Sequence, residues 1–463
     1  MAFAQSDTPV NAADVQTDLN WVWVMVAAML VVWMQAGFAF LEIGFARGKN
    51  VGTIVAKILV NFSICAVVWW AVGFAFAFGG GPAHSFWGDS GFFLTQGNTI
   101  NSTSLVPGEV NGGTYTFFFF QFAFAAVSLA IVWGSTLERI KFIVYPIYAV
   151  VFSAIIYPFV AHALFAGNLT PFGYGVQDFA GSSVVHLCGA VGALAAVLVL
   201  GPRRGKFGPD GKPRAIPGHN MPLFGLAVLI LWLGWFGFNP GSTLNAVGSS
   251  FAQVAVVTNL AAGAGVLGAT LTVLLVLKTL DVGMIGNGAI AGLVAITAPS
   301  GYVSPLGGVI IGFVAGVIVV FSVVLIEKKI DDPVGVLSAH GVAGIWGTLA
   351  CGLFTTKDLA LDNQKAGLFY GGGLTQLAVQ AVAVLAVIAF VFIVSYIVFK
   401  LVDVTIGMRV SAEEEEAGLD ISEHGMYGYP EQFIPEAELT GYNLSPVLTS
   451  ASAVAASSSP QEA

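Results

Sequence analysis

Charge is what this sequence lacks most. Only 9% of its 463 residues are Asp, Glu, Lys or Arg, whereas 56% are hydrophobic. A soluble globular chain carries about 25% charged residues, because water must solvate its surface. The composition therefore excludes an ordinary soluble protein. The net charge of −9 also argues against a nucleic-acid partner.

Cysteines are few, and signatures of catalysis or metal binding are missing. Cys65, Cys188 and Cys351 lie inside apolar runs and show neither a pairing pattern nor a metal-ligand spacing. We interpret them as small packing residues. The sequence contains no H-E-x-x-H motif and no nucleophile elbow. Nothing in it therefore supports an enzyme, a metal site or a bound cofactor.

Long apolar runs, by contrast, are abundant. Eleven of them have roughly 20 residues or more, which is enough to cross a hydrocarbon core about 30 Å thick. The 57 glycines suit close contacts between helices in lipid. We therefore predict an all-α integral membrane protein with eleven transmembrane helices. The expected spans are 21–45, 52–79, 115–136, 142–165, 179–200, 221–245, 251–277, 284–303, 305–326, 334–356 and 372–400.

Basic residues are unevenly distributed among the loops between these spans. If the N-terminus is outside, fourteen of the 17 Lys and Arg residues fall on the cytoplasmic side, and only Lys357 and Lys365 fall outside. This bias follows the positive-inside rule. An odd number of spans then places the C-terminus inside. Lys57, the remaining basic residue, is expected to snorkel from the inner end of the second helix.

Composition divides the chain into an external N-terminal segment, a transmembrane domain and a cytoplasmic C-terminal tail. Their bounds are 1–20, 21–400 and 401–463. Residues 401–429 are polar and able to form helices, whereas residues 444–463 are rich in Ser, Ala and Pro and are expected to be disordered. The acidic run Glu413–Glu416 has the pattern of a solvated face, which leaves a functional role equally open.

The most informative pattern is an internal repeat. The fifth helix starts near Asp178 and reaches His186, and the tenth starts near Asp332 and reaches His340; both stretches read D-x-x-G-x-x-x-x-H. Because five spans separate them, the two helices run in opposite directions. This predicts an inverted repeat of helices 1–5 and 6–10, followed by helix 11. Eight residues at about 1.5 Å each place both histidines near the middle of the membrane.

These polar residues also have ordinary structural interpretations. A lone histidine in an apolar helix is more often a packing residue. Matched depth in both repeats favours a pathway instead, because polar groups inside the membrane are costly. For Asp178 and Asp332 we expect helix capping rather than chemistry. For Glu42, near the inner end of the first helix, we expect a structural hydrogen bond.

At these residues the sequence resembles the ammonium transporter family, which has the Rh proteins as distant relatives. The resemblance covers nearly the whole chain. The stretches that carry it are Arg47-Gly-Lys-Asn50, Thr136-Leu-Glu-Arg-Ile140, Asp178-Phe-Ala-Gly181 with His186, Gly234-Trp-Phe-Gly-Phe-Asn239 with Ser242, Asp331-Asp-Pro333 with His340-Gly341, and Gly418-Leu-Asp-Ile-Ser-Glu-His-Gly425.

The resemblance implies a homotrimer with one pore through each subunit. It also implies a recruitment site for ammonium, a phenylalanine gate, a pair of pore histidines and two supporting residues. The recruitment site is Phe124, Phe165 and Ser242, and the gate is Phe124 and Phe238. The pore histidines are His186 and His340, and the supporting residues are Asp178 and Gln121. Phe165 departs from the family pattern, since well-known members have tryptophan there, and tryptophan attracts a cation more strongly than phenylalanine does.

By the same resemblance, ammonium gives up its proton at the gate and ammonia passes the histidines, with net transfer of charge. Potassium cannot lose a proton, and carrying it intact through an apolar constriction is costly. Methylammonium is a further expected substrate, a PII-type regulatory protein is an expected partner at the cytoplasmic face, and the expected location is the bacterial inner membrane. The alternative is an ammonium sensor with little transport that signals through the tail.

Overall fold

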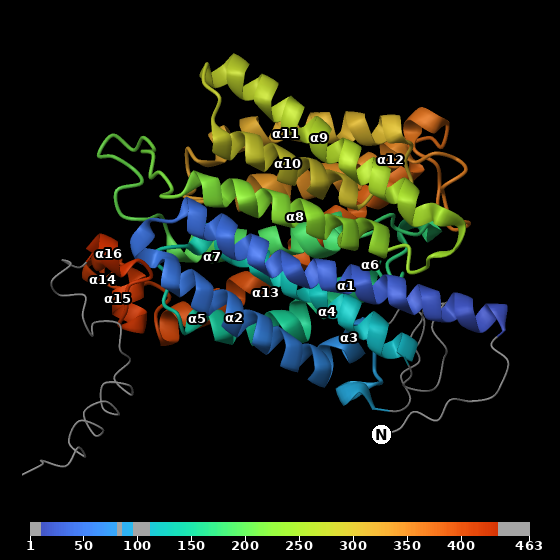
Figure 1. Ribbon diagram of the computed structural model, residues 1–463, viewed down its shortest axis with the longest axis horizontal. Helices are drawn as coiled ribbons and strands as arrows, with labels where there is room; N and C mark the ends of the chain where they lie inside the picture. Colours follow the sequence, from blue (N-terminus) through green and yellow to red (C-terminus); the bar gives the residue numbers. More distant parts are fainter. Residues whose placement is uncertain (1–10, 81–85, 96–111, 434–463) are drawn as a thin grey trace, which may run out of the picture.

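The computed structural model describes residues 11–80, 86–95 and 112–433. Its helices run mostly along the long axis of the molecule, as Figure 1 shows. The long helices and helix segments are α1 Ala12–Phe45, α2 Val51–Val68, α3 Phe74–Phe78, α4 Gly112–Trp133, α5 Val144–Val151, α6 Tyr157–Leu164, α7 Cys188–Leu200, α8 Met221–Gly241, α9 Ser250–Leu277, α10 Val282–Thr297, α11 Pro305–Ile326, α12 Ala343–Phe354 and α13 Thr375–Thr405. Three short helices follow, α14 Ala412–Ala417, α15 Leu419–His424 and α16 Pro430–Phe433.

In the part of the chain that the structure describes, four π-helical turns interrupt or open the membrane helices. They are η2 Trp69–Gly73 between α2 and α3, η5 Phe152–Ile156 between α5 and α6, η7 Ser182–Leu187 before α7 and η9 Leu337–Val342 before α12. A π turn holds one residue more than an α-helical turn, and such turns are frequent at functional sites.

The predicted all-α membrane fold is confirmed. Within the described residues, ten helices are long and apolar enough to cross a membrane, and α10 is a shorter apolar helix. Three predicted bounds are wrong, one of them the end of the eighth span, where α10 stops at Thr297 rather than at 303. The first helix begins at Ala12 rather than at 21, because the side chain of Asn11 caps it and accepts a hydrogen bond from the Asp14 amide. The last membrane helix continues to Thr405 rather than ending at 400.

The packing of the helices repeats between the two halves. The α2–α5 contact of the first half has its counterpart in the α9–α11 contact of the second, and α4–α7 corresponds to α10–α12. The two halves meet along α1 and α8, whose contact is the most extensive between two helices in the described part of the chain. The helices that carry His186 and His340, η7–α7 and η9–α12, are mostly buried among the other helices.

Glycines allow the closest of these contacts. Gly265 on α9 meets Gly292 on α10, and a Cβ atom added to Gly316 on α11 would overlap the backbone oxygen of Gly265. In lipid, where helices associate through packing rather than through exclusion of water, such small residues let backbones approach closely. The glycine-rich composition is thus used at helix interfaces.

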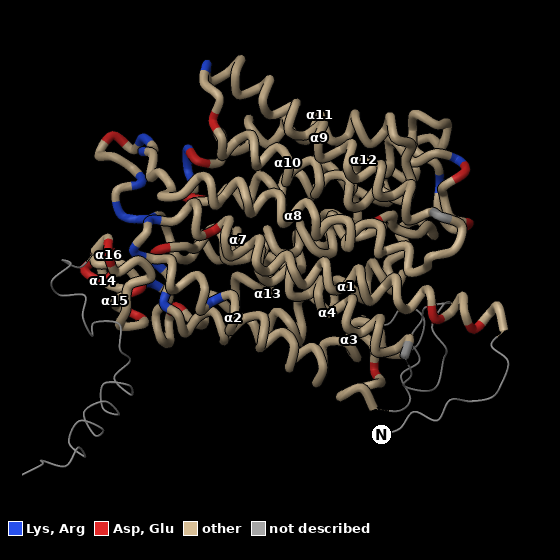
Figure 2. The backbone as a smooth tube through the Cα atoms, in the orientation of Figure 1, with Lys and Arg blue, Asp and Glu red and all other residues tan. Residues whose placement is uncertain are grey.

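The two ends of the helix bundle differ in charge. Lys and Arg gather at the end that carries α14–α16, as Figure 2 shows, and we call this the tail end. The other end, which carries Lys357, Lys365 and the start of α1, is called the far end. Residues 1–10 and 434–463 lie outside the described residues, so the predicted disorder of 444–463 does too.

Candidate functional site

Asp178 anchors the start of the first histidine helix at the far end. Its Oδ1 accepts a hydrogen bond from the Gly181 amide at 3.0 Å, and its Oδ2 accepts bonds from the amides of Ser183 and Val184 at 3.0 and 2.9 Å. Gly181 has a φ of 111°, a left-handed conformation that favours glycine. The carboxylate therefore satisfies backbone donors that the start of a helix leaves unpaired.

Asp332 anchors the second histidine helix in the same way at the tail end. Its Oδ1 accepts from the Val336 amide at 3.1 Å, and its Oδ2 accepts from the Leu337 amide at 2.8 Å. Gly335, three residues after the carboxylate, has a φ of 76°. The hydroxyl of Ser135 donates a further bond to Oδ1 at 2.9 Å. Burial raises the pKa of both Asp178 and Asp332 to about 6, although the hydrogen bonds act against this shift.

The two helices bring His186 and His340 together. Both histidines lie in π turns, and their Nδ1 atoms are 3.2 Å apart. The rings stack with centroids 5.3 Å apart and planes 19° apart. One Nδ1 must donate and the other must accept. In the neutral pair the donor ring therefore has its proton on Nδ1, and the acceptor ring has its proton on Nε2. The pair thus presents one donor and one acceptor.

Aromatic rings surround this pair. Trp235 stacks on His186 with centroids 5.2 Å apart, Phe238 lies 5.5 Å from the same ring, and Phe38 lies 6.4 Å from His340. The Nε2 of His186 is buried and has no hydrogen-bond partner among the described residues. A polar atom left unsatisfied in an apolar enclosure is available to a small polar ligand.

The residues of the expected gate lie against the histidine pair. The rings of Phe124 and Phe238 stack with centroids 4.0 Å apart and planes 18° apart. Phe165 meets Phe124 edge to face at 6.3 Å. The hydroxyl of Ser242 donates to the backbone oxygen of Phe238 at 2.8 Å. Gln121 lies on α4, three residues before Phe124, with its side-chain oxygen buried and without a partner among the described residues.

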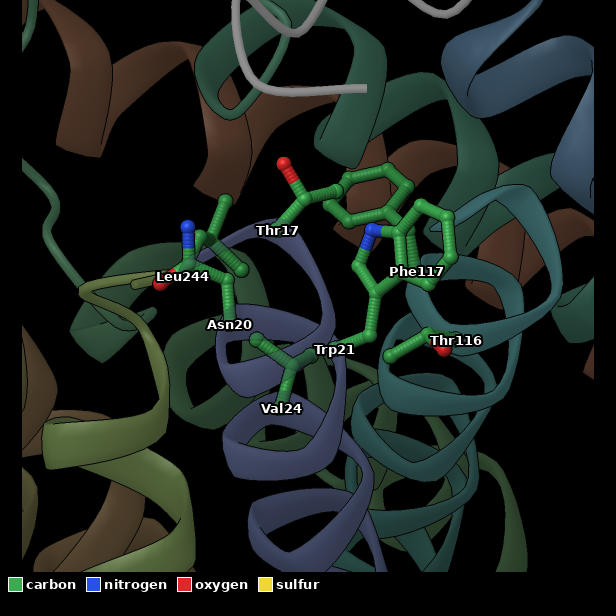
Figure 3. A pocket seen from close by; sticks show the side chains of 7 residues that line it. All are labelled: Thr17, Asn20, Trp21, Val24, Thr116, Phe117 and Leu244. Carbon is green, nitrogen blue, oxygen red and sulfur yellow. The ribbon is translucent and has the colours of Figure 1, made fainter. Parts of the chain in front are cut away.

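A small cavity lies at the far ends of α1 and α4, beside the segment after α8. It has a volume of about 40 Å³, and Figure 3 shows side chains from α1, from α4 and from the segment after α8 around it. Its lining residues are Thr17, Asn20, Trp21, Val24, Thr116, Phe117 and Leu244. We call it the Trp21 cavity. Its wall combines one indole ring with hydroxyl and amide side chains, which suits a small cation.

A second cavity lies beside His340 on the tail-end side. Its volume is about 20 Å³, and its polar lining side chains are Glu42, Asn287 and His340. We call it the Glu42 cavity. Glu42 forms an ion pair with Lys57 in which the side chains are 2% and 0% exposed. The expectation that Lys57 would snorkel is therefore wrong, because the buried carboxylate of Glu42 holds its ammonium group inside the bundle.

Charged side chains hold the tail end together below Asp332. Asp331 accepts from the Arg203 amide at 2.8 Å and from the guanidinium of the same residue at 2.9 Å. Arg139 lies 3.8 Å from Asp331 and Glu138 lies 3.5 Å from Arg203. Hydrogen bonds from Arg203 and the charge of Arg139 lower the pKa of Asp331 to about 2, although burial acts in the other direction.

The acidic tail segment joins this cluster. Glu415 is buried, and it accepts hydrogen bonds from the Arg204 amide at 2.7 Å and from the Arg409 guanidinium at 2.6 Å. Asp420 caps α2 by accepting from the amides of Gly52 and Thr53, both at 2.9 Å. The interpretation of the acidic run as a solvated face is therefore wrong for Glu415.

The far end is held by neutral amides instead. The Gln177 amide donates to Gln380 Oε1 at 2.9 Å, and Gln380 Nε2 donates back to the Gln177 carbonyl at 2.6 Å. The hydroxyl of Thr355 donates to Gln177 Oε1 at 2.8 Å, and Gln376 Nε2 donates to Gln380 Oε1 at 3.2 Å. Gln177 stands one residue before Asp178, just as Asp331 stands one residue before Asp332.

Sequence reasoning missed several of these residues. Trp235 is part of a quoted family stretch but had no assigned role, although it stacks on His186. Asn287 carried no signal. The acidic Glu42 and basic Lys57 are 15 residues apart within neighbouring apolar runs, and two opposite charges in such runs are the signal that predicts an intramembrane pair.

The chain matches known membrane proteins along most of its length. A sequence profile of the Ammonium Transporter Family matches residues 22–429. The ammonium transporter Amt2 of Archaeoglobus fulgidus is 42% identical over 435 residues, which are 91% of this chain and 90% of that protein.

Solved structures give the same grouping. A structure described as a sensor Amt protein has a TM-score of 0.81 and 36% identity, over 89% of this chain and 100% of that one. The crystal structure of Candida albicans Mep2 has a TM-score of 0.76 and 28% identity, over 87% and 90% of the two chains.

Proposed function

The chain belongs to the ammonium transporter family, and on that premise we propose that ammonium is deprotonated at the phenylalanine gate and crosses as ammonia past the histidine pair. The observation that carries this proposal is the contact of His186 with His340 at 3.2 Å, directly beside the stacked rings of Phe124 and Phe238. An apolar gate followed by a donor and an acceptor suits a neutral polar molecule better than an intact cation.

Recruitment precedes this step. Phe124, Phe165 and Ser242 form the recruiting site, and aromatic ring faces attract a cation while the hydroxyl accepts one of its hydrogen bonds. Because phenylalanine at position 165 attracts a cation less strongly than tryptophan, we assign part of the recruitment to Trp21. Its cavity lies at the far ends of α1 and α4, the second of which also carries Phe124.

The proton takes a separate route. Moving ammonia alone leaves its proton at the gate, and the hydrogen-bonded histidine pair offers a path across the apolar barrier. Net charge then crosses with each ammonia. Asp178 and Gln121 support the gate region, Asp178 by fixing the helix that carries His186 and Gln121 by its buried amide.

The surroundings of the site follow from the same premise. The protein is a multi-pass membrane protein, and we place the tail end in the cytoplasm because it carries most of the basic residues. We further propose the bacterial inner membrane as its location, a homotrimer with one pore in each subunit, methylammonium as a second substrate and a PII-type regulator at the tail end. The sensor alternative rests on one similar structure, described as a sensor Amt protein.

The test is current measured in proteoliposomes on a solid-supported membrane, with ammonium and then potassium added. The wild-type chain is compared with His186→Ala and His340→Ala, and His219→Ala serves as a control because that histidine lies in the loop before α8 and bonds the Ala46 carbonyl. We expect an ammonium current that potassium does not give and that only the two pore variants lose.

Two other outcomes separate the alternatives. An ammonium current that survives in His186→Ala contradicts the proton route through the histidine pair. If the wild-type chain gives neither current nor a change of internal pH with ammonium, the protein is a sensor with little transport.

A further inference from the structure

We propose that Glu42, held by Lys57, is the group that takes the proton from His340 at the cytoplasmic side of the pore. This inference rests on the proposed function and extends it by naming residues that the recruitment, gate and histidine assignments leave out. The observations behind it are a buried ion pair between two membrane spans and a cavity that Glu42 of this pair lines together with His340.

The ion pair is costly where it stands. Each charge loses its hydration inside the bundle, and the mutual attraction of a buried pair often fails to repay that loss compared with apolar side chains. A packing role would therefore be filled as well by two apolar residues. Ionisable groups inside membrane helices commonly mark ion or proton pathways, and they face the interior of the bundle as Glu42 does.

The carboxylate is placed to act on the pore. Lys57 binds Glu42 through Oε2, which leaves Oε1 as the oxygen that can serve the cavity. The cavity of about 20 Å³ is lined by Glu42, Asn287 and His340. A cavity needs roughly 10–15 Å³ and two or more polar partners to hold one water. One water can thus bridge the imidazole and the carboxylate, with the amide as a third partner.

The charged and titratable groups around Glu42 are few. Lys57 neutralises the carboxylate, Tyr145 lies with its ring 5.8 Å from the Lys57 ammonium, and His340 lies across the cavity. Lys57 has two effects in this arrangement. It keeps Glu42 ionised while the carboxylate waits for a proton, and it makes the protonated state short-lived because that state leaves the ammonium unpaired.

The proton step balances as follows. The Nε2–H of protonated His340 gives its proton to the cavity water, and the water gives one of its own protons to Glu42. The carboxyl group then releases that proton toward the tail end and returns to the ion pair with Lys57. His340 is left neutral with its proton on Nδ1, which is hydrogen-bonded to Nδ1 of His186. The imidazole has to return to its Nε2–H tautomer before Nδ1 accepts the next proton from His186.

The decisive variant removes both charges together, because Glu42→Gln alone leaves Lys57 buried without a partner and can prevent folding. We compare Glu42→Gln/Lys57→Met with the wild-type chain for current and for internal pH. We expect the ammonium current to fall by about tenfold or more. Ammonia then enters without its proton, so the liposome interior becomes more alkaline than with the wild-type chain.

Glu42→Asp is the conservative control, since it keeps a carboxylate next to Lys57, and it is expected to retain most of the current. Thermal unfolding and gel filtration check that each variant is folded. A wild-type current from the double variant overturns the proposal, because the carboxylate is then not needed. A folded double variant that gives neither current nor alkalinisation also overturns the proposal. The ion pair is then needed to keep the pore open to ammonia rather than to transfer the proton.

Failure of this inference is distinguishable from failure of the proposed function. If His186→Ala keeps its current, the histidine route itself fails. If His186→Ala loses its current while the double variant keeps it, only the role of Glu42 is wrong. A wild-type chain that moves ammonia without current overturns the role of Glu42 as well, because no proton then crosses.

Discussion

The two helices that carry His186 and His340 begin alike but stand in different surroundings. Each starts with an aspartate that caps it and a glycine with positive φ three residues later. At the far end the residue before the aspartate is Gln177, which is bound by neutral amides. At the tail end it is Asp331, which is bound by buried arginines.

The two ends therefore differ in how their hydrogen bonds respond to salt and pH. The hydrogen bonds around Gln177 join neutral groups, which salt does not screen, and Asp178 beside them is the group with a pKa raised to about 6. The tail end is bound to the C-terminal tail through charged groups. Asp331 binds the backbone amide of Arg203 and Glu415 of the tail binds the next amide, that of Arg204. The tail and the segment before the His340 helix therefore bind adjacent peptide groups of one loop.

The largest loss of stability is expected from Asp331→Ala. The substitution leaves Arg203 and Arg139 buried without their carboxylate, which typically costs about 3–5 kcal/mol of stability. We expect a large drop in the thermal unfolding temperature of purified protein, measured by intrinsic fluorescence. A drop no greater than that of the far-end variant described next would contradict the view that charge dominates the tail end.

That far-end counterpart is Gln380→Leu. Its amide makes four hydrogen bonds, to the amide and carbonyl of Gln177, to the Thr348 carbonyl and to Gln376. Removing the amide leaves its buried partners without hydrogen bonds, which costs about 1–3 kcal/mol of stability. We expect a smaller drop in unfolding temperature that is unchanged between low and high salt. A salt-dependent loss would mean that this end is not a neutral network.

A pH series separates the three aspartates by sign. The pKa of Asp331 in the folded protein is lowered to about 2, so its stabilising effect is present above its unfolded value of about 3.9 and is lost as the pH falls through 2. The pKa values of Asp178 and Asp332 are raised to about 6. Their protonation therefore stabilises the fold as the pH falls from about 6 to 4.

The expected profile follows from those signs. The unfolding temperature rises by a few degrees from about pH 6 to pH 4, and it falls below about pH 4. Asp331→Asn removes part of the acid loss, and Asp178→Asn or Asp332→Asn flattens the rise. A monotonic fall from pH 7 downward in the wild-type protein would show that burial does not dominate at either helix start.

The smallest expected effect concerns the Trp21 cavity. Trp21→Leu removes the indole ring, and a cation–π contact at a partly exposed site is worth about 0.5–1 kcal/mol. We expect the ammonium concentration for half-maximal current to rise about two- to fivefold while the maximal current stays the same. Trp33→Leu, an exposed ring on the same helix, is the control. Equal behaviour of the two variants would remove Trp21 from recruitment.

The sequence was sufficient for features that depend on pattern. Apolar runs predicted the membrane helices, and the spacing from Asp178 to His186 and from Asp332 to His340 predicted the inverted repeat. It was insufficient where partners come from distant segments. Lys57 was expected to snorkel because snorkelling depends on the residue's own depth, whereas its burial depends on Glu42 in another helix.

The same limit explains the tail and the first helix. Glu415 has the composition of a solvated residue, and only the fold brings Arg204 and Arg409 to it. The first helix extends beyond its apolar run to Ala12 because a cap at Asn11, not hydrophobicity, sets its start. Contacts across hundreds of residues leave no local trace in a single sequence.

The π turns also show where the symmetry of the repeat is kept and where it is lost. A π turn widens a helix locally and is frequent at functional sites. The turns at His186 and His340 lie at matching places in the two repeats. The turns η2 and η5 lie in spans whose counterparts, α9 and α11, are regular α-helices. The two halves therefore share the irregular backbone at the histidines and differ in the backbone of the spans around them.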